Sequence, residues 1–108
     1  MQIVRVSCPK LNASIAFNRI GFRHLIRKGG VRRPRGEQKR RFALLRYAPG
    51  IISNPRANVV LRTKGRAHFW MFQEERGGRM VKVIVRQLRG GKKHFYSIFS
   101  GKKKPSSN

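Results

Sequence analysis

Three histidines and one cysteine are the side chains of this 108-residue chain that most often hold metal ions or attack substrates. His24, His68 and His94 lie far apart in the sequence, and no cysteine accompanies any of them. A zinc site requires nitrogen and sulfur ligands at closer spacing, so the sequence predicts no metal centre and no other cofactor. Cys8 is the single cysteine of the sequence, so no disulfide can form within the chain. This fits a reducing compartment.

Carboxylates, the other common catalytic groups, are scarce in this sequence. The acidic residues are Glu37, Glu74 and Glu75. Glu74 and Glu75 are adjacent in an expected turn, a position that does not suit paired general acid–base catalysis. The sequence therefore predicts that the protein is not an enzyme and has no small-molecule substrate.

Positive charge dominates the chain. Twenty-seven Lys and Arg residues oppose 3 Asp and Glu residues, which gives a formal net charge of +24. Like charges at this density oppose the compact state. Nucleic acid is the commonest polyanion that neutralises such a surface, and it gains affinity from counterion release. A membrane is the alternative partner, but no stretch approaches the ~20 apolar residues that span a bilayer.

Residues 1–41 predict a basic N-terminal extension. The first 36 residues contain no acidic side chain, and apolar residues recur there at helical spacing at Ala13, Ala16, Phe17 and Ile20. This pattern is typical of an organellar transit peptide, and a segment with that role is expected here to act without being cleaved. A basic segment that lies on RNA is an equal alternative.

The second part of this extension, residues 28–41, contains almost no apolar residue. Two adjacent glycines and Pro34 favour an extended backbone, with a disordered linker as the alternative. Arginine binds phosphate bidentately, so the segment predicts a tail threaded between phosphates.

Residues 42–100 predict a small β-domain, and residues 101–108 a short basic tail. Apolar segments alternate with turn residues, and the expected strands are Phe42–Tyr47, Asn58–Thr63, Ala67–Gln73, Met80–Gln87 and His94–Phe99. This spacing indicates an all-β barrel or sandwich of about five short antiparallel strands. The expected core residues are Leu61, Phe69, Met71, Val81, Val83, Val85, Phe95 and Phe99. Trp70 and Tyr96 are expected nearer the surface, where aromatic rings can stack on bases.

Two motifs between residues 28 and 65 have a recognisable spacing. Gly29-Gly30 is followed by Arg33, and the run 57–65 reads Ala-Asn-Val-Val-Leu-Arg-Thr-Lys-Gly. Both motifs resemble large ribosomal subunit protein twenty-seven of the bacterial and organellar type. The chain departs from that family after Gly65, where a longer loop is usual, and residues 1–27 match nothing in the bacterial pattern.

This resemblance implies a structural constituent of the large ribosomal subunit, in a divergent mitochondrial form. It implies rRNA as the main partner, with neighbouring ribosomal proteins beside it. The family's N-terminal tail runs toward the peptidyl transferase centre, so Gly29, Gly30 and Arg33 are expected near tRNA acceptor ends. The expected location is the mitochondrial ribosome, with another organellar or the cytoplasmic ribosome as alternatives.

Other assignments stay open. Met80–Phe99 also resembles the opening of small ribosomal subunit protein sixteen. A free, non-specific nucleic-acid-binding protein is a further alternative, and a cationic membrane-active peptide is disfavoured because no long amphipathic helix is expected.

The candidate RNA-binding residues are the basic side chains of the tail and the turns, together with the glycine pair. They are Lys28, Gly29, Gly30, Arg32, Arg33, Arg35, Lys39, Arg40, Arg41, Arg46, Arg62, Lys64, Arg66, Lys92 and Lys93.

Overall fold

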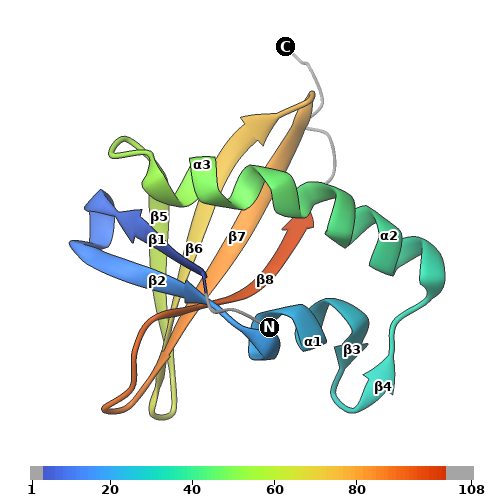
Figure 1. The fold of residues 1–108 in the computed structure, drawn as a ribbon, viewed down its shortest axis with the longest axis horizontal. Coiled ribbons are helices and arrows are strands. Elements are labelled where there is room, and N and C mark those ends of the chain that lie inside the picture. The colour runs from blue at the N-terminus through green and yellow to red at the C-terminus, as the bar shows by residue number, and fades with distance from the viewer. Residues whose placement is uncertain (1–3, 102–108) are drawn as a thin grey trace.

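Most of the fold is β-structure: a computed structural model describes residues 4–101 and contains a six-stranded mixed sheet with helices beside it (Figure 1). In chain order its elements are β1 (Val4–Cys8), the 3₁₀ helix η1 (Pro9–Leu11), β2 (Ala13–Phe17), α1 (Arg19–Ile26), β3 (Arg27–Lys28), β4 (Val31–Arg32), α2 (Arg35–Leu44), the 3₁₀ helix η2 (Leu45–Tyr47), α3 (Ala48–Ser53), β5 (Asn58–Lys64), β6 (Ala67–Arg76), β7 (Arg79–Leu88) and β8 (His94–Ser100). Apart from Gly101, the expected basic tail lies outside the described residues.

The four C-terminal strands form an antiparallel meander in the order β8-β7-β6-β5. The last four predicted strands are therefore confirmed. Between β6 and β7, Gly77 and Gly78 have φ values of 59° and 77°. A two-residue turn with positive φ at both positions matches the right-handed twist of the flanking strands, and glycine adopts it without steric cost.

The prediction of about five antiparallel strands is correct only in part. The hairpin β1–β2 extends the meander because β2 runs parallel to β8, pairing Ala16 with His94. The Ala16 N–H donates to the Lys93 carbonyl oxygen over 3.1 Å. Residues 13–17 are thus a strand and not part of an amphipathic helix. The buried side chains of Ile15 and Phe17 gain more from packing on the sheet than from helical spacing.

Helices replace two other expected features. The predicted strand Phe42–Tyr47 is instead the end of α2 and η2, and the predicted extended segment 28–41 folds into the β3–β4 hairpin and α2. Pro34 precedes α2 with φ −54°, a geometry suited to a helix start. Glu37 then pairs with Arg41 at i,i+4 spacing, which stabilises the helix. Extended backbone was predicted from the two glycines and Pro34, but these residues form the hairpin turn and precede the helix, and the residues after them have adequate helix propensity.

One sheet face carries the hydrophobic core. Val81, Val83 and Val85 are buried at period-two spacing, as predicted, and Phe95 is buried with them. The core also includes residues from β6, β8, α3 and the β1–β2 hairpin: Phe72, Ile98, Ile51, Ile52, Ile15 and Phe17. The Phe17 and Phe95 rings stack with centroids 4.9 Å apart. Leu61, predicted in the core, is 55% exposed because β5 is the edge strand beyond this cover.

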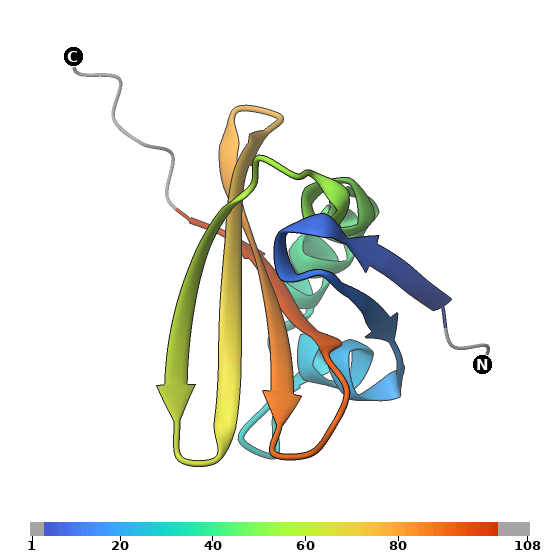
Figure 2. The ribbon, with the colours of Figure 1, turned by 90° about the vertical axis from the view of Figure 1, so that its left-hand side faces the viewer.

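The opposite face of the meander remains partly open. Register pairs Ile84 with Met71 and Arg86 with Phe69, and all four side chains are only half-buried. The helices α1 and α2 reach the sheet chiefly through β8, at one margin of the meander (Figure 2). The fold therefore leaves a basic and aromatic sheet surface beside the ends of two helices.

A substitution at Gly21 tests the packing of α1 on β8. A Cβ at this position would collide with the carbonyl oxygen and ring of Phe95. We expect Gly21→Ala to lower the free energy of unfolding by about 1–3 kcal/mol, measured by urea denaturation. Gly36→Ala on α2 is the matched control, because its nearest neighbour would be the Arg40 guanidinium at 3.8 Å. The control should raise stability by up to about 1 kcal/mol. Equal effects of the two variants would contradict the packing described.

Candidate functional site

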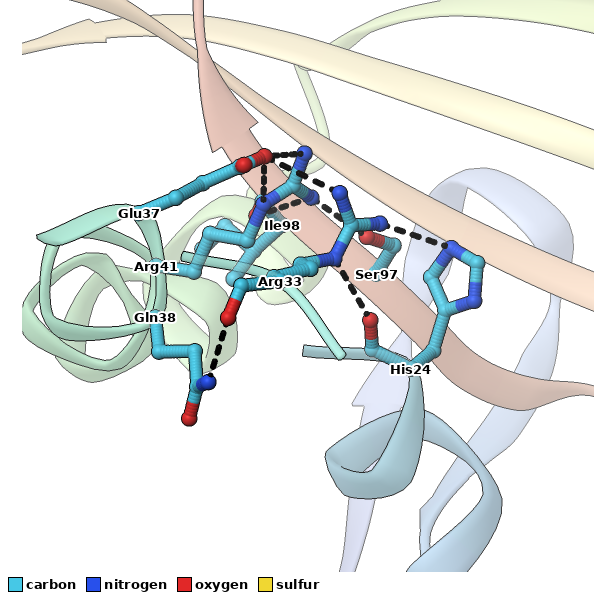
Figure 3. A network of polar contacts seen from close by, with 7 residues as sticks. All are labelled: His24, Arg33, Glu37, Gln38, Arg41, Ser97 and Ile98. Carbon is cyan, nitrogen blue, oxygen red and sulfur yellow. Dashed lines mark hydrogen bonds and ion pairs between the residues drawn. The ribbon is translucent and has the colours of Figure 1, made fainter. Parts of the chain in front are cut away.

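Arg33 is a buried cation, with 8% of its surface exposed. Its guanidinium Nε donates to the His24 carbonyl oxygen (3.0 Å), and its Nη1 donates to Glu37 Oε1 (2.9 Å; Figure 3). The third guanidinium nitrogen, Nη2, lies 3.4 Å from His24 Nε2. The Gln38 amide also donates to the Arg33 carbonyl oxygen over 2.7 Å. Arg33 therefore joins the last turn of α1 to the first turn of α2.

Glu37 holds a second guanidinium next to the first. Arg41 Nη2 and Nε donate to Glu37 Oε1 over 3.0 Å and 3.2 Å. These hydrogen bonds, together with the positive charges of Arg41 and Arg33, lower the pKa of Glu37 below its usual range. Arg41 Nη1 continues the network to β8, donating to Ser97 Oγ (3.0 Å) and to the Ile98 carbonyl oxygen (3.2 Å). Burial lowers the pKa of Arg41, and Glu37 opposes that shift.

His24 is held in its neutral form. Burial is the largest cause that lowers its pKa to about 4, and the charges of Arg33 and Arg41 lower it further. Its ring stacks on Tyr96 with centroids 4.2 Å apart. A neutral imidazole has one nitrogen that accepts a hydrogen bond or a proton. At neutral pH, the acceptor nitrogen of His24 is thus Nε2, which faces the donor protons of Arg33 Nη2.

These side chains line one pocket of about 280 Å³ at the open face of the sheet. Its walls come from α1, the β3–β4 hairpin and α2, and its floor from β7 and β8: His24, Lys28, Arg33, Arg41, Ile84, Tyr96, Ser97 and Phe99. A second pocket of about 210 Å³ shares Arg41 and Phe99 with it. Figure 3 shows the Arg33 guanidinium between Glu37 and His24, with the Arg41 guanidinium beside it reaching Ser97. The cations outnumber the one carboxylate of the network, so the pocket suits an anion such as a phosphodiester.

The structure separates the predicted RNA-binding residues into two groups. Most are exposed, on the β3–β4 hairpin, α2, η2, β5 and the turns: Lys28, Gly29, Gly30, Arg32, Arg35, Lys39, Arg40, Arg46, Arg62, Lys64, Arg66 and Lys92. Arg33 is buried, and Arg41 and Lys93 are half-buried. Arg33 and Arg41 thus form ion pairs with Glu37 of the same chain, whereas the exposed residues can bind a polyanion.

Gly29 and Gly30 do not lie in an extended tail, as the sequence had predicted. They form the turn of the β3–β4 hairpin, with φ values of 58° and 80°. Both are exposed, and a Cβ built at either would meet no atom within 4 Å. Their role in this fold is therefore to close a tight turn.

Sequence reasoning did not find the pocket, because its members come from distant segments. His24 was assessed only against the other histidines, and Ser97 was not considered. One signal was present: Glu37 is the only acidic residue between residues 1 and 73, and it lies four positions from both Arg33 and Arg41. A lone carboxylate at that spacing indicates internal pairing.

Comparisons with known proteins do not assign the chain: no family model, no curated protein and no solved structure matches it. Within residues 4–101, no three His, Cys, Asp or Glu side chains are grouped so that they could hold a metal ion. No helix in that part of the chain is long and apolar enough to cross a membrane.

Removal of the Glu37 charge should weaken the fold. Glu37→Gln leaves the buried Arg33 guanidinium without its ionic partner, so we expect a loss of about 2 kcal/mol in the free energy of unfolding. Glu75→Gln removes the same charge from an exposed position on β6 and should stay within about 0.5 kcal/mol of the parent. Urea denaturation at constant ionic strength measures both. Equal stability of the two variants would show that the network does not stabilise the fold.

The neutral state of His24 predicts a response to pH and to phosphate. The unfolded chain binds a proton at this histidine near pH 6.5 and the folded chain only near pH 4, so stability should decline as pH falls through that window. A bound phosphate would offset the repulsion from Arg33 and Arg41, so it should raise the pKa of His24. NMR titration of the imidazole with and without inorganic phosphate measures this shift, with His24→Gln to assign the resonance. An unchanged titration curve at saturating phosphate would exclude anion binding beside His24.

Proposed function

We propose that this protein binds RNA and cleaves its phosphodiester backbone in the pocket beside His24. The observation that carries the proposal is the convergence of a neutral imidazole, two guanidiniums and the Ser97 hydroxyl in one open pocket. A group that accepts protons beside groups that bind phosphate is the arrangement that RNA transesterification requires. This proposal departs from the expectation of a protein without enzymatic activity, which rested on the scarcity of carboxylates in the sequence.

The chemistry follows from the positions of these groups. Arg33 Nη2 moves from His24 Nε2 to a phosphoryl oxygen, and the freed imidazole takes the proton from a ribose 2′-hydroxyl while the 2′-oxygen attacks the adjacent phosphorus. The bond from phosphorus to the 5′-oxygen breaks, and that oxygen takes a proton from solvent. The products are a 2′,3′-cyclic phosphate and a free 5′-hydroxyl, and the imidazolium returns its proton to water. Arg33 and Arg41 stabilise the charge that develops on the phosphoryl oxygens.

Substrate binding makes His24 a better base. With a pKa of about 4, the free imidazole binds protons weakly, whereas a general base works best when its pKa is near the ambient pH. The phosphate reduces the electrostatic part of this shift by neutralising nearby cations. Base activation is thereby coupled to occupancy of the pocket.

The exposed cations supply affinity. Lys28, Arg32, Arg35, Lys39 and Arg40 lie on the β3–β4 hairpin and α2, next to the pocket. Each phosphate contact of this kind releases a counterion and carries no base preference. We therefore expect RNA binding that weakens with salt and shows little sequence specificity.

A structural role in the ribosome is the second candidate. Cations exposed on several sides of the fold favour it, because rRNA can surround a small protein. The resemblance to large-subunit protein twenty-seven is the other support. Co-sedimentation with large ribosomal subunits after a high-salt wash would favour this role, and release into the soluble fractions would favour a free RNA-binding enzyme.

Cleavage is tested with a fluorescent oligoribonucleotide and its 2′-deoxy counterpart. The parent protein should cleave only the ribo-oligonucleotide and leave 2′,3′-cyclic phosphate ends. His24→Gln should lower the cleavage rate at least about 100-fold while RNA affinity stays nearly constant, since it removes the base and not the cations. Arg79→Gln, on the distant β6–β7 turn, is the control and should cleave normally. Cleavage that persists in His24→Gln, or that extends to the deoxy substrate, would refute the mechanism.

A further inference from the structure

Another hollow lies at the end of the meander where the β5–β6 and β7–β8 turns meet. It measures about 410 Å³, and Arg66 and His68 line it from one hairpin while Gln87 and Arg89 line it from the other. Figures 1 and 2 both show these two turns at the same end of the sheet. The hollow is separate from the His24 pocket, since no residue lines both.

The hollow borders the sheet face opposite to the His24 pocket. Register pairs His68 with Gln87 and Trp70 with Val85, and Val85 belongs to the buried core. The His24 pocket instead includes Ile84, whose side chain points to the other face because strand residues alternate. The core face of the sheet is thus covered by other elements near Phe72, whereas the same face is exposed to solvent near His68.

The His68 ring lines the hollow, and the Trp70 ring lies next to it. The His68 and Trp70 rings lie with centroids 5.9 Å apart and tilted by 43°. The Thr63 hydroxyl lies 3.1 Å from His68 Nδ1 and fixes the ring orientation. The Lys93 ammonium lies 5.1 Å from the centre of the Trp70 ring. A planar ligand can therefore stack on a ring that is already held in place.

Cationic side chains flank these rings, and the carboxylates of the same strands lie far from them. Arg66 and Arg89 are both exposed on the turns. The carboxylates of β6, Glu74 and Glu75, lie at its opposite end. A ligand with a flat ring and a negative charge fits this combination, and an unpaired nucleotide has both.

We propose that this hollow binds an unpaired nucleotide of an RNA strand, with the base against His68 and the phosphate on Arg66 and Arg89. A cavity of 300–1,000 Å³ is the usual size for a small ligand, so about 410 Å³ holds one nucleotide. Stacking on aromatic rings selects single strands, because bases in a duplex are covered. The inference rests on RNA as the ligand but not on cleavage. It gives the protein a second contact on the sheet face that the His24 pocket does not use.

The single tryptophan of the chain provides a direct readout of this site. Trp70 emission should be quenched saturably by a 2′-O-methyl oligouridylate, which cannot undergo cleavage through its 2′-oxygen. We expect His68→Ala to weaken the fluorescence-derived affinity about tenfold, and Arg66→Gln with Arg89→Gln to weaken it further. The matched control is Arg56→Gln with Arg79→Gln, which removes two charges at the other end of the strands. It should weaken binding much less.

Three outcomes would overturn this site. The first is quenching that His68→Ala leaves unchanged, and the second is an equal loss of affinity in the charge control. The third is equal quenching by an oligoglutamate of the same length. That result would indicate a site for any polyanion or for an acidic protein. His24→Gln separates this test from the cleavage proposal, because it should abolish cleavage and preserve the quenching. Intact cleavage without quenching would reject the hollow alone.

Discussion

The arrangement of the pocket depends on one carboxylate that is shared by two guanidiniums. Glu37 Oε1 accepts hydrogen bonds from Arg33 and Arg41, and without it these two cations would repel each other inside the protein. Arg33 in turn holds α1 through the His24 carbonyl oxygen, and Arg41 joins α2 to the buried residues Ser97 and Ile98 of β8. One ion-pair network therefore fixes three elements and places a neutral imidazole beside two charges.

The net charge of +24 makes each carboxylate of the chain important for its stability. Few carboxylates are available, and the folded chain uses them at specific places: Glu37 beside α1 and β8, and Glu74 beside Arg76 and Asn54. Most of the other cations within residues 4–101 are exposed to solvent and repel one another. A polyanion relieves that repulsion, so ligand binding and stability are linked by mass action. The same charges that limit the stability of the free protein would supply its affinity for RNA.

The sheet offers two different surfaces to such a ligand. One face meets the ends of α1 and α2 and carries the pocket with His24. The other face is covered by α3 and the β1–β2 hairpin, but only as far as the middle of the meander. Beyond that cover, the long hairpins expose His68 and the turn arginines. The two proposed contacts thus have one structural origin, a meander whose strands extend beyond the elements that pack on it.

Some of these features were fixed by local sequence. Charge composition predicted a polyanion as partner, and alternation of apolar residues predicted β5 to β8 and the buried valines of β7, because both depend on residue type and short-range spacing. The turns between these four strands followed for the same reason, whereas the Gly29-Gly30 turn did not. Sequence could not show that residues 4–17 join the sheet through a parallel pairing with β8, since that contact links positions about eighty residues apart. The glycine pair and Pro34 also led to the wrong prediction that the segment before Phe42 is extended, because the ion pairs of Glu37 with Arg33 and Arg41 depend on the folded helix. The site itself required the tertiary structure: His24, Arg41 and Ser97 become neighbours only when α1 and α2 pack on the same strand, and burial there, rather than sequence position, makes the imidazole neutral.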